Sequence, residues 1–472
     1  MSDKKETKKK GFKLPSAYTI LLGLTAIIAL IAQVVPQVQP SSVSDVLMAP
    51  INGLNDAIDI VLFIFFIGGF LGIVNATGVL DAGVGSIVRK LKGKELMLIP
   101  ILMFVFSLGG TSYGMCEESI AFYALVTTTM MMAGFDPLVA VGTIALGAGT
   151  GVLGSTVNPF LVSTSIDASM KAGVEINQAV VIGLGIALWL VSLSISIFFV
   201  MKYAKKVQAN QKNTLLSNDE MNEAKKAYLN NSDFNKIEEM NGKQKVVVGL
   251  FFLAFIVMVM GVIPWENFGI TLFTKTDVLL GASLGSWWFG ELSIWFTIIG
   301  IAIALISGMK EKEIISNFMT GASDMIGVAM IIGISRGVSV IMGSTGLDTY
   351  LLSEASGILS SVAPLVFVNI SYLIFIGLSF LVPSTSGLAT ISMPIFAPLA
   401  QSLGFSPELM IAVFSAGSGI VNLVTPTSGV IMGGLAVARV EYSTWLKFVG
   451  KILICIFIAS AIILSIGMMI LV

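Results

Sequence analysis

The sequence contains no histidine and only two cysteines among its 472 residues. Without histidine the chain lacks the commonest metal ligand of proteins and the side chain that most readily titrates near neutral pH. Any proton that it carries must therefore use a carboxylate, and we predict no metal site. Cys116 and Cys455 lie in apolar segments far apart in the sequence, so a disulfide framework is not indicated.

Charge is also scarce in this chain. Lys, Arg, Asp and Glu make up 12% of the residues, about half the share of an ordinary soluble domain. Apolar residues make up 55%, and apolar stretches of about 20 residues, the length that spans a bilayer, recur along the sequence. Because a backbone in lipid must satisfy its own hydrogen bonds, these stretches must be helices. The sequence therefore predicts an all-α polytopic membrane protein with about nine to eleven transmembrane helices.

Motifs of soluble enzyme chemistry are missing as well. The sequence has no GxxxxGK[ST] phosphate loop, no HExxH and no nucleophile elbow. It has no soluble domain that could hydrolyse ATP, which argues against a primary pump. A membrane-bound enzyme or receptor is the weakest hypothesis. The expected partners are a small solute and the lipid bilayer, with no nucleic acid and no cofactor.

Lysine and arginine are distributed asymmetrically along the chain. If their clusters are cytoplasmic, only Lys171 and Lys275 fall in outside loops. The clusters lie at 4–13, 89–94, 202–245, 310–312 and 439–451. The first apolar stretch, 17–35, resembles a signal peptide but has no cleavage site, so we expect a retained span. We predict a multi-pass protein of the inner (cytoplasmic) cell membrane with a cytoplasmic N-terminus.

Two apolar segments are too long for one crossing and are broken in their middles. The segment 96–133 is interrupted from Gly109 to Gly114, and its first arm, 96–108, is only about 20 Å of helix. That is short for a hydrocarbon core of about 30 Å, so we interpret the segment as a re-entrant hairpin. The segment 359–403, interrupted from Val382 to Gly387, predicts a second hairpin. Before the first of them, the prolines at 36, 40 and 50 indicate an outside loop.

The sequence repeats itself at an offset of 270 residues. GFDP at 134–137 falls on GFSP at 404–407, and Gly149 falls on Gly419 without a gap. Both hairpin breaks and two further Gly/Pro-rich interruptions coincide at the same offset. Internal repeats of this kind define the architecture of a fold.

The charge rule orients the two repeats in opposite directions. The span before the first hairpin, 58–77, runs from outside to inside, whereas its counterpart, 319–345, runs from inside to outside. The chain is therefore predicted to contain two inverted repeats, each with a re-entrant hairpin and an interrupted helix. Inverted repeats with broken helices at mid-membrane are the plan of many secondary transporters, and the breaks are where the substrate site is expected.

The four breaks supply the candidate substrate-binding residues. Glycine and proline free backbone groups there, and these groups bind anions at helix N-termini and cations at carbonyls. The candidates are Thr111 and Ser112 at the first tip, Ser155, Thr156 and Asn158 in the first interruption, Ser384, Thr385 and Ser386 at the second tip, and Asn422, Thr425, Thr427 and Ser428 in the second interruption.

Ionisable residues within spans are functional candidates by default. Glu117 and Glu118 follow the first tip, where they could attract a cationic group, bind a coupling cation, carry a proton or cap the hairpin structurally. Arg336 lies within a span and could hold a substrate carboxylate or pair with a hairpin glutamate. We place Glu117 and Glu118 in the candidate binding set and leave the role of Arg336 open.

Three stretches resemble a known family. They are FKLPSAYTILLGL near the start, GGTSYGMCEESIAFYALV at the first tip and LVPSTSGLATISMPIFAPLAQSLGF at the second. They are similar to YfcC-type carriers of the C4-dicarboxylate anaerobic carrier-like branch of the ion transporter superfamily. The resemblance implies a scaffold, a mobile transport domain that holds both hairpins, elevator-type alternating access and a homodimer joined through the scaffold.

With that resemblance the chain divides into six expected regions. These are a basic cytoplasmic N-terminus (1–13), scaffold helices of repeat one (14–95), transport-domain half one (96–203), a cytoplasmic linker (204–244), scaffold helices of repeat two (245–358) and transport-domain half two (359–472).

The leading hypothesis is a secondary active transporter of a small amino acid. The pair Glu117–Glu118 favours a basic substrate, with exchange of the arginine–ornithine kind that the resemblance implies. The alternative is a carrier of a dicarboxylate or another small carboxylate, coupled to sodium ions or protons, because hydroxyl-rich tips and helix N-termini suit carboxylates. A channel needs a continuous polar pore, which suits this two-repeat pattern less well.

Overall fold

The computed structural model of the chain describes residues 17–79, 94–116, 119–229, 241–262, 265–268, 270–273, 276–277, 280–360, 362–382 and 384–471. Every regular element in these ranges is helical, which confirms the all-α prediction. Six described helices are long and apolar enough to cross a bilayer. They are α3 (Ile58–Ala76), α5 (Leu98–Tyr113) with the short η1 (Glu95–Met97), α10 (Gln178–Ala209), α13 (Phe289–Ser307), α17 (Pro364–Leu381) and α21 (Tyr442–Ile470).

The remaining helices include a pair joined at a bend. α14 (Glu311–Asp324) and α15 (Ile326–Thr345) follow each other with a bend of 43° between them, and only together are they long and apolar enough to cross a bilayer. The others are α1 (Ala17–Val34), α2 (Val43–Asp56), α6 (Ile120–Met132), α7 (Pro137–Val141), η3 (Gly142–Leu146), α8 (Gly147–Leu153), η4 (Pro159–Ser163), α9 (Thr164–Lys171), η5 (Gln211–Asn213), α11 (Asn218–Tyr228), α12 (Gly242–Val262), η7 (Trp265–Phe268), α16 (Leu347–Leu359), α18 (Thr385–Ser402), α19 (Pro407–Asn422) and α20 (Gly429–Ala438).

Shifting the first half by 270 residues superimposes its helix order on that of the second half. α1, α2 and α3 fall on α13, α14 and α15, and the hairpin α5–α6 falls on α17–α18. The chain from α7 to α8 falls on α19, η4 and α9 fall on α20, and α10 falls on α21. The structure therefore contains the two repeats that the sequence predicts.

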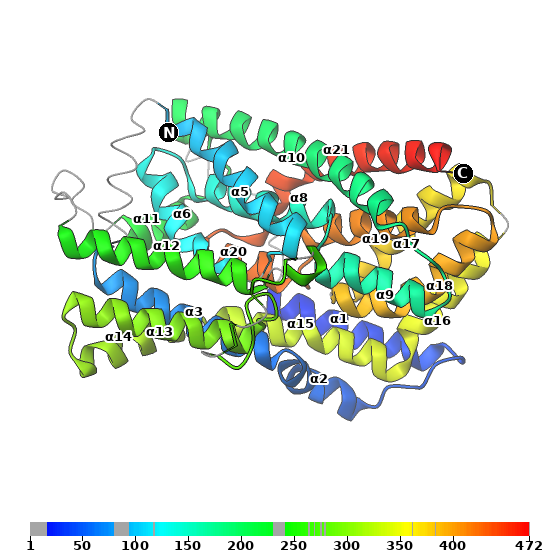
Figure 1. Cartoon of the computed structure of the whole chain (residues 1–472), viewed down its shortest axis with the longest axis horizontal. Coiled ribbons are helices and arrows are strands. Elements are labelled where there is room, and N and C mark those ends of the chain that lie inside the picture. The colour runs from blue at the N-terminus through cyan, green and yellow to red at the C-terminus, as the bar shows by residue number, and fades with distance from the viewer. Residues whose placement is uncertain are drawn as a thin grey trace, which may run out of the picture.

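The repeats are inverted. α5 and α6 lie in the left half of the molecule, whereas α17 and α18 lie in the right half (Figure 1). The two hairpins therefore open at opposite ends, as the charge pattern predicts.

The packing of the helices before the hairpins follows the same symmetry. α2 of the first repeat packs along α15 of the second, and α14 of the second packs along α3 of the first. Glycine permits both contacts. A β-carbon on Gly53 would lie 2.2 Å from the carbonyl oxygen of Gly333, and one on Gly321 would lie 2.2 Å from that of Gly68. Such close approach of backbones is typical of helices packed within membranes.

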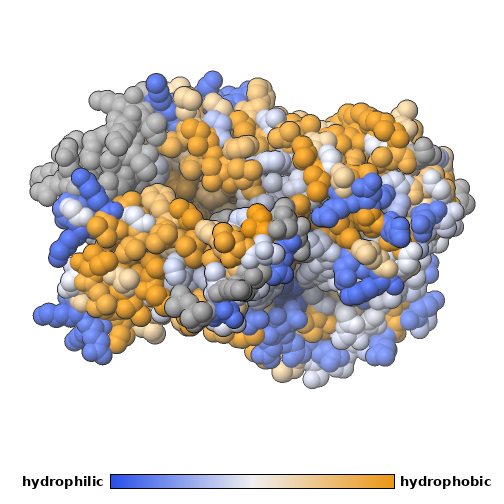
Figure 2. Space-filling view, in the orientation of Figure 1, coloured by the Kyte–Doolittle hydropathy of each residue, from blue (hydrophilic) through white to orange (hydrophobic). Residues whose placement is uncertain are grey.

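Large apolar side chains cover much of the outer surface. On α21, residues Ile454, Ile458, Ile462 and Ile466 are each at least half exposed and form one stripe at helical spacing. Figure 2 shows hydrophobic residues over much of one face, with hydrophilic residues at the left end and the lower right. A soluble monomer rarely exposes apolar patches on this scale. The surface is that of a protein surrounded by lipid.

Two local predictions are wrong. The proline-containing stretch before α3 is not all loop, because α2 forms there behind a capping box in which Ser42 and Asp45 bond each other's backbone N–H groups. The first hairpin does not break at Gly109, because α5 continues to Tyr113. Gly110 packs on the backbone of α8, and the helix ends at Gly114, whose φ of 81° favours glycine.

The expected linker is docked on both halves of the chain. The hydroxyls of Thr214 and Tyr203 each donate to a carboxylate oxygen of Asp136 at 2.6 Å. A carboxylate oxygen of Glu220 on α11 accepts from the backbone N–H of Glu441 at 2.8 Å. Burial raises the pKa of Asp136, although these hydrogen bonds oppose the shift. Residues 210–229 therefore form a folded cap over α6 and the ends of α10 and α20.

Candidate functional site

A cavity of about 180 Å³ lies where the four predicted breaks meet. The hairpin tips, the two interruptions and the residues beside them contribute polar and small residues to its lining: Gly114, Cys116, Ser119, Asn158, Ser384, Thr385, Ser386, Asn422, Thr427 and Ser428. The opposite wall comes from α3, α13 and α15 and their ends, with Ile60, Trp288, Phe289, Ile332, Ser335 and Arg336. The structure therefore brings together breaks that lie up to about 300 residues apart in the sequence.

The first hairpin tip is tied to the first interruption by backbone and hydroxyl bonds. The hydroxyl of Thr111 donates to the carbonyl of Gly154 at 2.8 Å, and the backbone N–H of Thr156 donates to the carbonyl of Thr111 at 3.0 Å. Gly114 lies against the amide of Asn158, where a β-carbon would come within 2.6 Å of its Oδ1. Only glycine fits between the tip and this side chain.

The second tip and interruption are held by helix caps. Ser384 caps α18 by accepting from the N–H of Gly387 at 3.2 Å, and Ser428 caps α20 by accepting from the N–H of Ile431 at 3.5 Å. The amide of Asn422 reaches the hydroxyl of Thr385 at 3.4 Å. Two helix N-termini, those of α18 and α20, therefore begin at residues that line the cavity, and their partial positive charge favours an anion.

Arg336 adds a full positive charge to this cavity. Among the lining residues that the structure describes, it is the only charged one. Its Nε lies 3.8 Å from a carboxylate oxygen of Asp56, and its side chain is 24% exposed. A guanidinium together with two helix N-termini is suited to a carboxylate. The sequence marks Arg336 as a functional candidate because it lies within a span, but it does not show that the side chain faces the cavity rather than another helix.

The predicted binding residues divide into two groups. Those that line the cavity are Asn158, Ser384, Thr385, Ser386, Asn422, Thr427 and Ser428. Those that instead hold the backbone of the breaks are Thr111, Ser112, Ser155, Thr156 and Thr425, whose hydroxyls bond neighbouring groups. Glu117 and Glu118 lie outside the described residues, although Cys116 before them and Ser119 after them both line the cavity.

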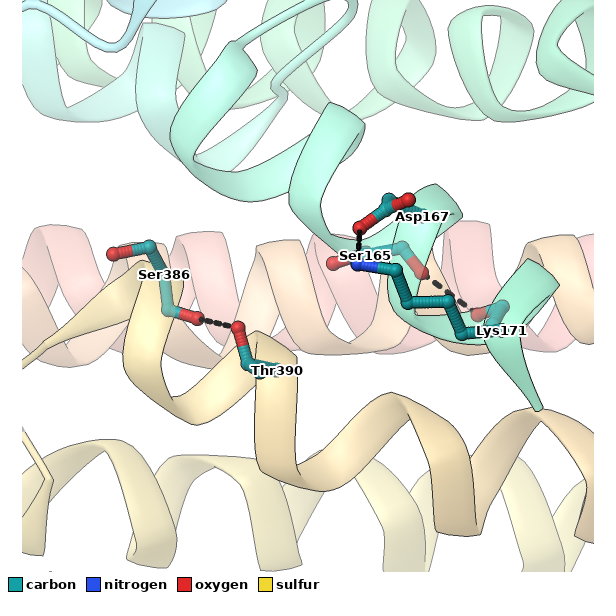
Figure 3. A network of polar contacts seen from close by, with 6 residues as sticks. Ser165, Asp167, Lys171, Ser386 and Thr390 are labelled. Carbon is teal, nitrogen blue, oxygen red and sulfur yellow. Dashed lines mark hydrogen bonds and ion pairs between the residues drawn. The ribbon is translucent and has the colours of Figure 1, made fainter.

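Polar side chains continue from the cavity along one face of α18. Ser386 lines the cavity, and the hydroxyl of Thr390, one turn on, donates to the Ser386 carbonyl at 2.9 Å. α9 packs beside this face and ends in an exposed ion pair between Lys171 and Asp167 at 2.7 Å (Figure 3). Within the described residues, no cluster of three or more acidic or cysteine side chains could hold a metal ion.

Comparison with known proteins identifies the family of the chain. The family model for the C4-dicarboxylate anaerobic carrier matches residues 16–469. An uncharacterised protein of Haemophilus influenzae is 31% identical over 423 residues, which are 89% of this chain and 78% of the relative. A protein of Escherichia coli named as the putative basic amino acid antiporter YfcC is 30% identical over 420 residues, 86% of this chain and 77% of the relative.

Two solved structures resemble the chain over nearly its whole length. The YdaH transporter of Alcanivorax borkumensis has a TM-score of 0.48 at 15% identity and covers 96% of this chain and 98% of its own. MtrF of Neisseria gonorrhoeae, described as representing a class of antimetabolite efflux pumps, has a TM-score of 0.45 at 16% identity, with coverages of 98% and 97%. From the family match and the curated relatives, the chain belongs to the C4-dicarboxylate anaerobic carrier family and is a membrane transporter, not an enzyme.

Proposed function

We propose that this transporter is a secondary active carrier of a small amino acid, with basic amino acids as its preferred substrates. The observation that carries the proposal is that all four breaks and Arg336 line one and the same cavity. Arg336 and the N-termini of α18 and α20 bind the carboxylate that every amino acid has. The positive side chain is matched by Glu117 and Glu118, which follow the cavity-lining Cys116 in sequence.

The name of the Escherichia coli relative supports exchange of basic amino acids as the mode of transport. Exchange of arginine for ornithine requires no coupling ion, because one solute drives the other. We propose the cytoplasmic membrane as the location, with the N-terminus and residues 210–229 on the cytoplasmic side, because the lysine and arginine clusters gather there.

We further propose an elevator-type mechanism. The cavity lies between two sets of helices, α1–α3 with α13–α15 and α5–α10 with α17–α21. The first set would be the scaffold, which also joins two protomers, and the second the moving transport domain. The hairpin tips belong to the moving set, so they would carry the solute past the scaffold wall formed by Ile60, Trp288 and Phe289.

A dicarboxylate carrier coupled to sodium ions or protons is the second candidate. The observation that favours it is the positive character of the described lining, in which Arg336 carries the only formal charge. The name of the matching family points in the same direction. The two candidates differ in the second charged group of the substrate, which is cationic in one and anionic in the other.

A thermal-shift screen of purified protein separates them. Amino acids and dicarboxylates are added with and without sodium, and the melting temperature is recorded. Stabilisation by arginine and ornithine, and not by succinate or fumarate, is the expected result. Stabilisation by dicarboxylates alone would contradict the proposal and favour a dicarboxylate carrier. Replacement of Glu117 or Glu118 by Gln should weaken arginine binding far more than dicarboxylate binding.

A further inference from the structure

Glycine contacts place Asp56 beside the cavity arginine. α2 crosses α15 where Gly53 packs against the backbone of Gly333 and Gly337. A β-carbon on Gly53 would lie 2.2 Å from the carbonyl oxygen of Gly333 and 2.3 Å from the backbone nitrogen of Gly337, so no larger residue fits there. This crossing fixes the register of the two helices. Asp56 lies about one turn after Gly53 on α2, and Arg336 lies between the two glycines in α15, so the crossing brings the carboxylate and the guanidinium to 3.8 Å.

The position of Asp56 is unfavourable for the helix that carries it. It is the last residue of α2, where the helix dipole disfavours negative charge. Its side chain is 51% exposed, so it is not needed as a buried counterion. The Nε of Arg336 lies 3.8 Å from the carboxylate oxygen, which is beyond a hydrogen bond and leaves the guanidinium group able to bind another carboxylate. The pair is therefore open to competition.

We propose that Arg336 and Asp56 form a clamp for the α-carboxylate and α-ammonium groups of an amino acid. The inference rests on the proposed function and identifies Asp56 as the residue that binds the α-ammonium group. The substrate carboxylate bonds the guanidinium fork of Arg336, and the substrate ammonium takes the place of Arg336 beside Asp56. Both substrate charges remain paired, so entry of the solute replaces one ion pair with two.

The short spacing selects for α-amino acids. The Nε of Arg336 and a carboxylate oxygen of Asp56 are 3.8 Å apart before the solute enters, so even when the ammonium group separates them they engage two opposite charges that lie close together on one solute. An α-amino acid carries its ammonium and carboxylate groups on one carbon atom, whereas a dicarboxylate would place its second carboxylate towards Asp56. That juxtaposition of like charges rejects the dicarboxylate. The clamp thus accounts for amino acid selectivity in a cavity whose described lining is positive.

Arginine and two analogues test the clamp in proteoliposomes that contain the full-length chain. Agmatine lacks the α-carboxylate, and 5-guanidinopentanoic acid lacks the α-amine. We expect Asp56→Asn to raise the KM for arginine about tenfold, the effect of losing one charge-assisted contact. The same variant should leave the inhibition constant of 5-guanidinopentanoic acid unchanged or lower. Arg336→Gln should raise the KM for arginine and leave inhibition by agmatine unchanged.

Asp59→Asn is the matched control, because it removes the same charge at the start of α3, three residues away. It should leave the KM for arginine unchanged. Equal effects of Asp56→Asn and Asp59→Asn, or equal weakening of arginine and its des-amino analogue in Asp56→Asn, would overturn the clamp. Asp56→Glu keeps the charge and should recover much of the affinity, which separates loss of the contact from misfolding.

The result for the unaltered protein separates the two proposals. If it transports arginine and Asp56→Asn leaves the KM unchanged, the clamp fails and the proposed function stands. If it takes up no amino acid, the proposed function fails and the clamp fails with it.

Discussion

Gly419 of α19 packs directly on the backbone of Leu153 in α8. A β-carbon on Gly419 would lie 2.4 Å from the Cα of Leu153, and one on Gly149 would lie 2.3 Å from the side chain of Leu423. Gly149 and Gly419 are 270 residues apart, as are Leu153 and Leu423, so the internal symmetry exchanges the two contacts. The crossing of α8 and α19 lies on the symmetry axis and lines the cavity with both glycines and Leu423.

Gly419→Ala should destabilise the protein, because its new methyl group meets a backbone atom that cannot move aside. Overpacking of this kind costs about 1–3 kcal/mol, so we expect the melting temperature in detergent to fall by a few degrees. Gly377→Ala on α17 is the matched control, since nothing lies within 4 Å of its added β-carbon. An equal fall for both variants would contradict the symmetric crossing.

Cys116 provides a chemical probe of the cavity. It lines the cavity at the first hairpin tip, whereas Cys455 lies on α21. In a Cys455→Ser background, we expect a methanethiosulfonate reagent to label Cys116, and saturating arginine to slow the labelling. The labelling rate is measured by mass spectrometry of the intact protein. A rate that arginine leaves unchanged would place the substrate away from this tip.

The cap of the second hairpin should affect affinity for the substrate. Ser384→Ala removes the acceptor for the N–H of Gly387, a loss that costs about 1 kcal/mol at a helix N-terminus. The first turn of α18 then no longer presents its N–H groups in a fixed direction, so we expect a several-fold rise in KM. Ser384→Thr keeps the cap and should behave like the unaltered chain. Ser402→Ala, at the far end of α18, is the control for loss of a hydroxyl.

The docked linker predicts resistance to protease. Asp136→Ala removes the acceptor of Thr214 and Tyr203, so residues 210–217 should detach from the end of α10. Trypsin should then cut faster after Lys212, and gel electrophoresis measures the rate. Asp219→Ala changes an exposed acid in the first turn of α11 and should leave the rate unchanged. Equal cleavage of both variants would show that the Asp136 bonds do not hold this segment.

Much of the architecture could be predicted from the sequence because its signals are local or periodic. The length of the apolar stretches predicts the helices, and the distribution of lysine and arginine predicts that the repeats are inverted. The 270-residue offset predicts which breaks correspond to each other. α2 was missed because Pro50 suggested a loop, although the capping box of Ser42 and Asp45 was visible in the sequence. The first break was placed too early, because Gly109 and Gly110 serve helix packing rather than helix termination.

The site could be predicted only in part. The breaks were identified, but a sequence does not show which hydroxyls face the cavity and which bond the backbone. Thr111 and Ser155 belong to the second kind. The neighbourhood of Arg336 and Asp56 was beyond prediction, because it depends on the crossing of α2 and α15, whose residues lie about 280 positions apart.

Counterflow in proteoliposomes tests whether the shared cavity is the transport site. Vesicles loaded with unlabelled arginine are diluted into a trace of radiolabelled arginine, and the accumulated label is followed with time. The unaltered chain should accumulate label transiently and saturably, and Arg336→Gln should reduce the initial rate about tenfold or more, as expected for loss of a charged contact to the carboxylate. A linear, non-saturating flux would indicate a channel, and an initial rate in Arg336→Gln equal to that of the unaltered chain would remove the cavity from the transport path.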